Sequence, residues 1–208
     1  DEEGTIVIGW DNPVARQVSE NISRERMTYG LFLGCDVRCL SFSQTKAHLF
    51  FEAMAFHEKI SCHLPRILGR HNVLNALAAI TVGTALGLKA QAMADALESF
   101  PGVYRRLNVF SQPDDCYLVH DYAHNPGKIQ ASLEAVRHAF SDYRIVVIFE
   151  PHRYSRLQTM YDQILGAFQL ADEVLITKIY GAGETEQPHL TPGTLAQDLT
   201  TRFGKKSK

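Results

Sequence analysis

The sequence lacks long apolar runs and a strong net charge. Its 208 residues include 21 lysines and arginines against 23 aspartates and glutamates, a formal charge of -2, so there is no basic footprint for nucleic acid. No apolar run approaches the roughly 20 residues that cross a membrane. The acidic start DEEG has no basic region like that of a secretory signal. We therefore expect a cytoplasmic protein with no nucleic-acid or membrane partner.

The sequence also has few cysteines, at positions 35, 39, 62 and 116. Disulfide frameworks are typical of short secreted chains, and this chain shows no secretory signal. A zinc site would need tighter cysteine pairs with histidines nearby. The cysteines are therefore predicted to be free thiols, and no metal site is predicted.

Two glycine-rich phosphate-binding patterns are absent. The chain contains no GxxxxGK[ST] and no GxGxxG. Without the first pattern, nothing in the chain makes a complete nucleoside triphosphate site by itself. Without the second, a nicotinamide oxidoreductase is a weak hypothesis, even though the fold pattern described below allows one.

The first half of the chain reads as a set of strands followed by helices. Short aromatic or β-branched runs predict a meander or mixed sheet with strands at 5–10, 29–34, 38–43, 48–56 and 60–65. Apolar spacing or Ala and Leu content predicts helices at 14–22, 71–87 and 90–100. Pro101 and Gly102 then interrupt the periodicity, which places a domain boundary between residues 1–100 and 101–208.

The second half alternates between strands and helices. Strands are predicted at 116–121, 144–150 and 173–180, and helices at 126–140, 156–171 and 191–203. Such alternation is typical of parallel strands joined by right-handed crossovers, so the fold class is α/β with a Rossmann-like layer. The polar tail GKKSK is expected to be frayed.

Three polar loops follow the three strands of this layer: DYAHNP, EPHRYSR and IYGAGETE. Ligands of open α/β sheets collect at the carboxyl ends of strands, so all three loops are predicted to lie at one edge of one sheet. Asn125 and Pro126 are explained by helix capping alone. Arg153 and Arg156 begin a helix, where positive charge opposes the helix dipole unless an anion binds, so an anionic ligand is favoured.

The helix start GRHNVLN holds two amides on one face. His71, Asn72 and Asn75 could face a purine edge, but asparagine at a helix start is also a common cap, and the residues alone favour the cap. The pair Arg105-Arg106, after the glycine, could reach phosphates or face solvent.

Five motifs follow one another between residues 69 and 184: GRHNVLNALAAI, FPGVYRRL, VHDYAHNP, FEPHRYSR and IYGAGE. Their order and spacing resemble the Mur ligase family, most closely its alanine-adding branch. The resemblance implies an ATP-dependent carboxylate–amine ligase of peptidoglycan synthesis. Residues 1–100 would be the later part of the central ATPase domain, and residues 101–208 the Rossmann-like C-terminal domain that binds the amino acid.

The resemblance also implies a reaction and an ATP site. ATP with Mg²⁺ would convert the carboxylate of UDP-N-acetylmuramate to an acyl phosphate, which the amine of L-alanine attacks. His71, Asn72 and Asn75 would lie at the adenine end of ATP. Arg106 would face the phosphates and Asp121 the ribose, and both are candidate catalytic residues.

The substrate side is implied in the same way. Tyr122 and His124 would lie near the reacting carboxylate and the amino acid, with His124 a third catalytic candidate. Arg153 and Arg156 would hold the amino acid's carboxylate, for which a planar guanidinium is suited. The amine must be neutral to attack, but no residue is identified as its base.

The chain departs from the family pattern in three respects. The phosphate loop, the magnesium ligands and the sugar-binding domain have no match, and neither do the final strand and glycine-rich turn expected after residue 203. Asn125 stands where the family has a second histidine. We interpret the chain as the C-terminal part of such a ligase and predict no turnover by this chain alone.

Two alternatives stay open. The first is a ligase of the same family that joins a murein tripeptide to the same sugar during recycling. Two clustered arginines favour the small carboxylate of alanine over a peptide. The second is a non-catalytic module that binds a nucleotide or an amino acid.

Overall fold

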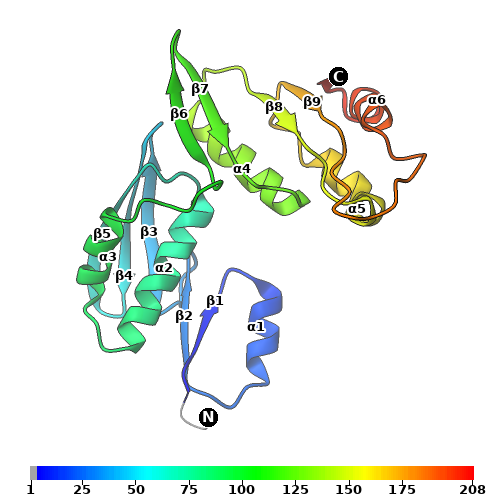
Figure 1. Ribbon diagram of the computed structural model, residues 1–208. Coiled ribbons are helices and arrows are strands. Elements are labelled where there is room, and N and C mark those ends of the chain that lie inside the picture. The colour runs from blue at the N-terminus through cyan, green and yellow to red at the C-terminus, as the bar shows by residue number, and fades with distance from the viewer. Residues whose placement is uncertain (1–3) are drawn as a thin grey trace. The chain divides into compact units, whose positions relative to one another are not determined.

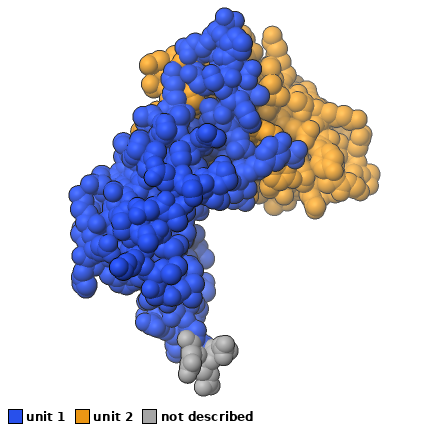
Figure 2. All heavy atoms as spheres, turned by 60° about the vertical axis from the view of Figure 1, so that its left-hand side comes forward, with its two compact units in different colours: residues 1–119 blue, residues 120–208 orange. Residues whose placement is uncertain are grey.

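The computed structural model describes residues 4–208, which form two compact units (Figures 1 and 2). The first unit ends at Val119 and the second runs from His120 to Lys208. Residues 1–3, which open the first predicted domain, lie outside the described part. The division between the two units, after Val119, lies further along the chain than the predicted domain boundary at 100/101. That boundary stays a prediction.

The first unit contains a mixed five-stranded sheet in the order β1-β2-β3-β4-β5. The strands are Ile6–Gly9, Arg26–Gly30, Val37–Gln44, His48–Ala55 and Glu58–Pro65, and helix α1 (Pro13–Glu20) connects the first two. The first three strands are parallel and the last three antiparallel, which confirms the mixed sheet. The strand predicted at 29–34 is displaced to 26–30, because residues 31–34 form a turn that ends at Gly34 with a φ of 93°.

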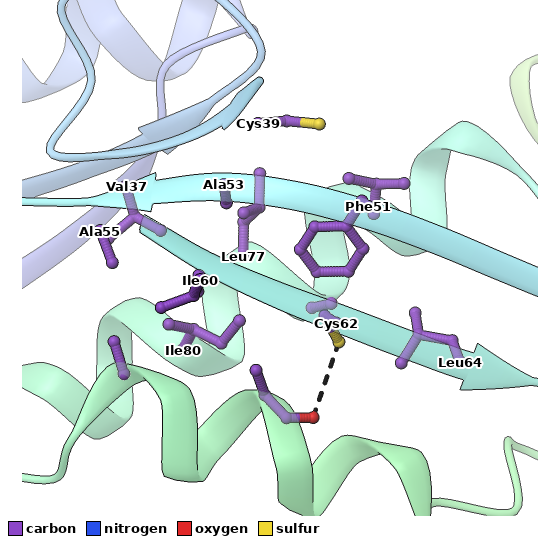
Figure 3. Close-up of a cluster of buried hydrophobic side chains, with 14 of the residues drawn as sticks. Val37, Cys39, Phe51, Ala53, Ala55, Ile60, Cys62, Leu64, Leu77 and Ile80 are labelled. Carbon is purple, nitrogen blue, oxygen red and sulfur yellow. Dashed lines mark hydrogen bonds between the residues drawn. The ribbon is translucent and has the colours of Figure 1, made fainter. Parts of the chain in front are cut away.

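Helix α3 (Ala90–Glu98) packs against β5, and helix α2 (Arg70–Ala85) packs against α3 and against β1, β2 and β3. Side chains of both helices share one core with those of β3, β4 and β5 (Figure 3). Alternate residues of β4 are buried, so one face of the strand enters the core with residues Leu49, Phe51, Ala53 and Ala55. Helix α3 also covers the edge strand: Gln91 bonds both the backbone N–H and the carbonyl of Ser61. These bonds satisfy a strand edge that would otherwise be open to pairing.

Strands β6 (Asn108–Gln112) and β7 (Cys116–His120) form a separate two-stranded sheet. The prediction that β7 belongs to the parallel layer is therefore wrong for the described residues. The connection at Asp114 and Asp115 explains the difference, because their φ values of 60° and 52° close a tight turn of the kind that joins antiparallel strands.

The second unit has a parallel sheet in the order β10-β9-β8. Its strands are Val146–Phe149 (β8), Glu173–Ile176 (β9) and Lys206–Ser207 (β10), and its helices are Pro126–Ala139 (α4), Tyr154–Gly166 (α5) and Pro192–Phe203 (α6). Its separate core joins α4, α5 and α6 to β8 and β9 through buried side chains such as Leu133, Leu157 and Leu199. The α/β class is confirmed.

The C-terminal tail is ordered, so the expectation of a frayed end is wrong. Gly204 ends α6 in the left-handed region, with a φ of 62°, and turns the chain back toward β9. Lys205 Nζ then donates to the carbonyls of Gln169 and Ala171 at 2.6 and 3.0 Å. These contacts bring Lys206 and Ser207 into register beside Glu173 and Val174.

Candidate functional site

Four aromatic rings from three loops meet in the second unit. Tyr122 and His124 follow β7, His152 follows β8, and Tyr180 follows β9. The His124 ring centroid lies 5.0 Å from that of Tyr122 and 5.7 Å from that of His152, and the His152 and Tyr180 centroids are 5.3 Å apart. The three loops therefore come together as predicted, although β7 is not a strand of the parallel sheet. We call these four residues the ring cluster.

Backbone pairing beyond the strand ends holds two of the loops side by side. His152 and Tyr180 form an isolated parallel bridge. The N–H of Arg153 donates to the carbonyl of Tyr180, and the N–H of Tyr180 donates to that of Pro151, both at 2.8 Å. The pairing extends the β8–β9 ladder by one more link, so the two rings are presented from a rigid edge.

The loop DYAHNP contains residues that anchor it to α4 and residues whose rings belong to the ring cluster. The Asn125 side chain accepts a hydrogen bond from the N–H of Lys128 at 3.0 Å, and Pro126 is the first residue of α4, which confirms the predicted cap. Asp121 Oδ2 accepts from the Ser132 hydroxyl at 3.1 Å and so ties the loop to α4. Tyr122 and His124, which lie between these two anchors, contribute their rings to the ring cluster.

One proton position on His124 follows from its partner. His124 Nδ1 lies 2.8 Å from the carbonyl oxygen of Tyr122. A carbonyl can only accept a hydrogen bond, so Nδ1 carries the proton. In the neutral ring, Nε2 is then an acceptor with a lone pair.

His152 has the opposite arrangement. Arg156 Nη1 lies 3.1 Å from His152 Nδ1 and 3.2 Å from the His152 carbonyl oxygen. A guanidinium can only donate, so His152 Nδ1 accepts and Nε2 carries the proton. Burial lowers the pKa of His152, and the positive charge of Arg156 lowers it further, which keeps this imidazole neutral.

The start of α5 is occupied by a carboxylate of the chain itself. Arg153, with a φ of 70°, precedes the helix and supplies no side-chain cap. Instead, Glu184 accepts from the Ser155 N–H at 2.9 Å and from its hydroxyl at 2.7 Å. The Ser155 N–H bond is the main cause of the lowered pKa of Glu184, with a smaller effect from Arg153. The anion expected at this helix start is thus partly supplied by Glu184, while Arg156 is turned toward the ring cluster.

The predicted amide pair lies on α2 in the first unit. The helix begins after Gly69, and no side chain caps it. The φ of Gly69 is 95°, in the positive-φ region that favours glycine. Asn72 Nδ2 donates to the carbonyl of Leu68 at 2.7 Å, and Asn75 Nδ2 donates to Asn72 Oδ1 at 3.0 Å. The favoured capping interpretation of these asparagines is therefore wrong, because the helix starts one turn too early for Asn72 to cap it. His71 lies beside Asn72, with His71 Nε2 3.3 Å from its Nδ2.

Arg106 is exposed in the first unit, in the segment that precedes β6. Its neighbours Arg105 and Leu107 have φ values of 62° and 48°, and the Arg105 N–H donates to Asn108 Oδ1 at 2.6 Å. The segment is thus a tight turn with a fixed backbone. Asp121 belongs to the second unit, so an ATP site that uses both residues stays a prediction.

Other chemistry-bearing groups lie away from the ring cluster. All four cysteines are free thiols, and burial raises the pKa of Cys62 to about 12, which makes it unreactive. No group of three or more His, Cys, Asp or Glu residues among residues 4–208 is placed to hold a metal ion. Within the same range, no helix is long and apolar enough to cross a membrane.

Two cavities are also distinct from the ring cluster. One, of about 390 Å³, lies beside β4, β5 and α3, and the other, of about 480 Å³, lies between α5 and α6. Neither is lined by an arginine or by any residue of the ring cluster. We therefore place the site at the strand ends, where a cation and four rings converge, and not at the larger hollows.

Sequence reasoning missed part of this site. The sequence indicates His152 and Glu184 only as members of their loops, and it does not single out Tyr180 or Ser155. His152 lies before α5 and pairs with Tyr180, so no helical spacing marks its contact with Arg156. No local signal marks the contact between Ser155 and Glu184, which are 29 residues apart.

The geometry defines an α/β module in which a guanidinium and two histidine rings lie together at the strand ends of a parallel sheet. Residues 105–207 match the family model described as "Mur ligase, glutamate ligase domain". The UDP-N-acetylmuramate–L-alanine ligase of Endomicrobium trichonymphae is 34% identical over 205 residues, which are 99% of this chain and 46% of that protein. The chain belongs to the Mur ligase family.

Solved structures agree with this assignment. The UDP-N-acetylmuramate–alanine ligase of Thermotoga maritima matches with a TM-score of 0.70 and 30% identity, over 87% of this chain and 38% of that one. A MurF ligase of the same organism, solved in complex with ADP, matches at a TM-score of 0.70 and 21% identity over all of this chain and 49% of that one, which shows the shared fold. The chain thus spans less than half the length of these relatives.

Proposed function

We propose that this chain is the C-terminal part of an ATP-dependent ligase that joins L-alanine to UDP-N-acetylmuramate through an acyl phosphate, in peptidoglycan synthesis in the cytoplasm. The relatives that carry this activity in their names support the proposal. Within the chain, the second unit would bind the amino acid.

The observation that carries the proposal is the position of Arg156. Its guanidinium lies against His152, whose ring contacts His124, so a cation stands beside two imidazole rings. A guanidinium binds a carboxylate with two parallel hydrogen bonds. An α-amino acid held in this way has its amine one carbon from its carboxylate, and the amine therefore lies at the ring cluster.

The first unit would hold the adenine of ATP at the amide pair. Asn75 is exposed, and its Oδ1 accepts no hydrogen bond from residues 4–208. An amide acceptor beside an amide donor fits the amino edge of adenine, with His71 and Asn72 supporting it. Arg106 would face the phosphates and Asp121 the ribose. When bound, ATP supplies the phosphoryl group that activates the sugar's carboxylate.

Magnesium is the part of the proposal that this chain does not fit. The described residues contain no cluster of carboxylates or histidines placed for it, and the family's magnesium ligands have no match in the sequence. We therefore assign the Mg²⁺ ligands to another part of the enzyme.

The first test is titration of the chain with L-alanine, followed by calorimetry or by NMR shifts of the second unit. We expect Arg156→Ala to weaken binding at least tenfold, since a charge-assisted hydrogen bond contributes about 1.5–3 kcal/mol. Arg202→Ala is the matched control, because Arg202 pairs with Asp162 on the surface of the same unit. Equal affinity of wild type and Arg156→Ala for L-alanine would refute the amino-acid site.

A second test separates the alternatives within the family. ADP release is measured with UDP-N-acetylmuramate, Mg-ATP and either L-alanine or a murein tripeptide. We expect the full-length enzyme that carries this sequence to prefer L-alanine and the 208-residue chain alone to release no ADP. Preference for the tripeptide would instead assign the recycling reaction, and no turnover by the full-length protein would favour a binding module.

A further inference from the structure

The ring cluster contains two histidines, and protonation breaks a hydrogen bond of only one of them. Protonation of His124 at Nε2 leaves its Nδ1–H bond to the Tyr122 carbonyl intact. Protonation of His152 requires its Nδ1 to give up the bond from Arg156, because a guanidinium offers no lone pair. The fold therefore leaves one imidazole able to accept a proton and holds the other neutral.

The charged and titratable groups around the two rings come from three segments. Tyr122 lies on the loop of His124, and Tyr180 contacts His152 from the loop after β9. Glu150, Arg153 and Arg156 act on His152 from the segment that runs from the end of β8 into the first turn of α5. The cations on this segment disfavour a second positive charge on His152 and leave the Nε2 of His124 as the acceptor for an incoming proton.

We propose that His124 Nε2 is the base that deprotonates the α-ammonium of the incoming amino acid. This inference rests on the proposed function, in which Arg156 holds the amino acid's carboxylate. An N–H bond of the ammonium breaks, the proton moves to Nε2, and the electron pair stays on the nitrogen. That pair forms the bond to the acyl carbon, while the C–O bond to phosphate breaks and phosphate leaves with its bonding electrons. The departing phosphate oxygen takes the second proton that the nitrogen loses as the amide forms.

His152 has a different part in this proposal. Its Nδ1 accepts a hydrogen bond from Arg156 and its Nε2–H is a donor, so it cannot take a proton from the ammonium. We therefore assign it as a positioning residue, which holds Arg156 beside the ring cluster. The pair thus offers one acceptor and one donor, and only the acceptor, His124, takes a proton.

The tautomers are tested on the chain itself by long-range ¹H–¹⁵N correlation spectra of the imidazoles at neutral pH. The His124→Asn and His152→Asn variants assign the two signals. We expect a protonated Nδ1 for His124 and a protonated Nε2 for His152. A His124 protonated at Nε2 instead would overturn the proposal.

The base role is tested in the full-length enzyme with two nucleophiles. His124→Asn keeps an amide N–H near the position of Nδ1, and so the bond to the Tyr122 carbonyl, but it removes the basic nitrogen. We expect alanine addition to fall about 10²-fold or more at pH 7 and to recover partly as the pH rises. Hydroxylamine, which is already neutral at pH 7, needs no base, so hydroxamate formation from the acyl phosphate should be unchanged.

The outcomes distinguish this inference from the proposed function. If His124→Asn slows hydroxamate formation as much as alanine addition, the residue has a structural role and the base assignment is wrong. If the wild-type enzyme forms no ATP-dependent hydroxamate with UDP-N-acetylmuramate, the proposed function itself fails.

Discussion

The first and second units begin their site-bearing helices in opposite ways. In the second unit, Asn125 caps α4 and thereby has a structural task, while Tyr122 and His124 before it face the ring cluster. In the first unit, α2 starts at Gly69 without a side-chain cap, and Asn72 and Asn75 bond to a carbonyl and to each other. The same residue type is thus part of the scaffold in one unit and part of the candidate site in the other.

This difference shows how the chain separates stability from binding. A cap satisfies backbone N–H groups that have no partner in the helix, so its loss weakens the fold. An exposed amide that satisfies no backbone group contributes little to folding and remains able to bind a ligand. The following predictions test that separation, in order of their expected effect on stability.

The largest effect is expected from the two separate cores. Leu49 of the first unit and Leu199 of the second are both fully buried, in different clusters of side chains. Leu49→Ala should destabilise the first unit by about 2–5 kcal/mol and Leu199→Ala the second by a similar amount. Hydrogen exchange of each unit measures the result. If either change weakened both units equally, the units would not be independent.

A smaller loss is expected at the cap of α4. Asn125→Ala removes the acceptor for the Lys128 N–H and should cost about 1 kcal/mol in the free energy of unfolding of the second unit. Asn125→Asp keeps an acceptor at the same position and is the control. Urea denaturation measures both variants. An alanine variant as stable as wild type would mean that Asn125 is present for the site and not for the helix.

These contrasts also show which features the sequence predicts. Asn125 and Pro126 start α4 through contacts within three residues, so the pattern suffices. The alternation of strands and helices likewise predicts the β8–β9 layer. By contrast, β7 pairs with β6 because of two left-handed aspartates, and alternation alone does not reveal backbone φ values.

The candidate site likewise combines contacts set by local sequence with contacts between residues far apart in the chain. The tautomer of His124 is set by a residue two positions away, and that of His152 by one four positions away, so both depend on local sequence. The placement of Glu184 at Ser155 and of Tyr180 beside His152 depends on residues 28 or 29 apart. Such contacts exist only once the parallel strands are in register.

A pH-dependent contribution is expected from Glu184 at the start of α5. Because its pKa is lowered in the folded chain, chiefly by the Ser155 N–H, it stabilises the second unit above the ordinary pKa of glutamate. This contribution is lost as the pH falls through the lowered pKa. Glu184→Gln should therefore be less stable than wild type at pH 7, with a difference that shrinks below about pH 4.

Urea denaturation of the second unit across this pH range measures the effect of Glu184. Glu186→Gln, two residues along the same loop, is the matched control, because Glu186 acts on Tyr154 of α5 through its charge while both Ser155 bonds go to Glu184. A difference between wild type and Glu184→Gln that persisted unchanged at pH 3 would show that the carboxylate charge is not its cause.

The smallest effect on stability is expected at Asn75. Asn75→Ala removes an exposed amide and adds the best helix former, so the free energy of unfolding should change by no more than about 0.5 kcal/mol. Binding of a non-hydrolysable ATP analogue to the full-length enzyme should weaken about fivefold, the loss of one hydrogen bond of about 1 kcal/mol. Asn72→Ala should lower both the free energy of unfolding and the affinity for the ATP analogue, because Asn72 also donates to the Leu68 carbonyl. Unchanged ATP affinity in Asn75→Ala would remove the first unit from the nucleotide site.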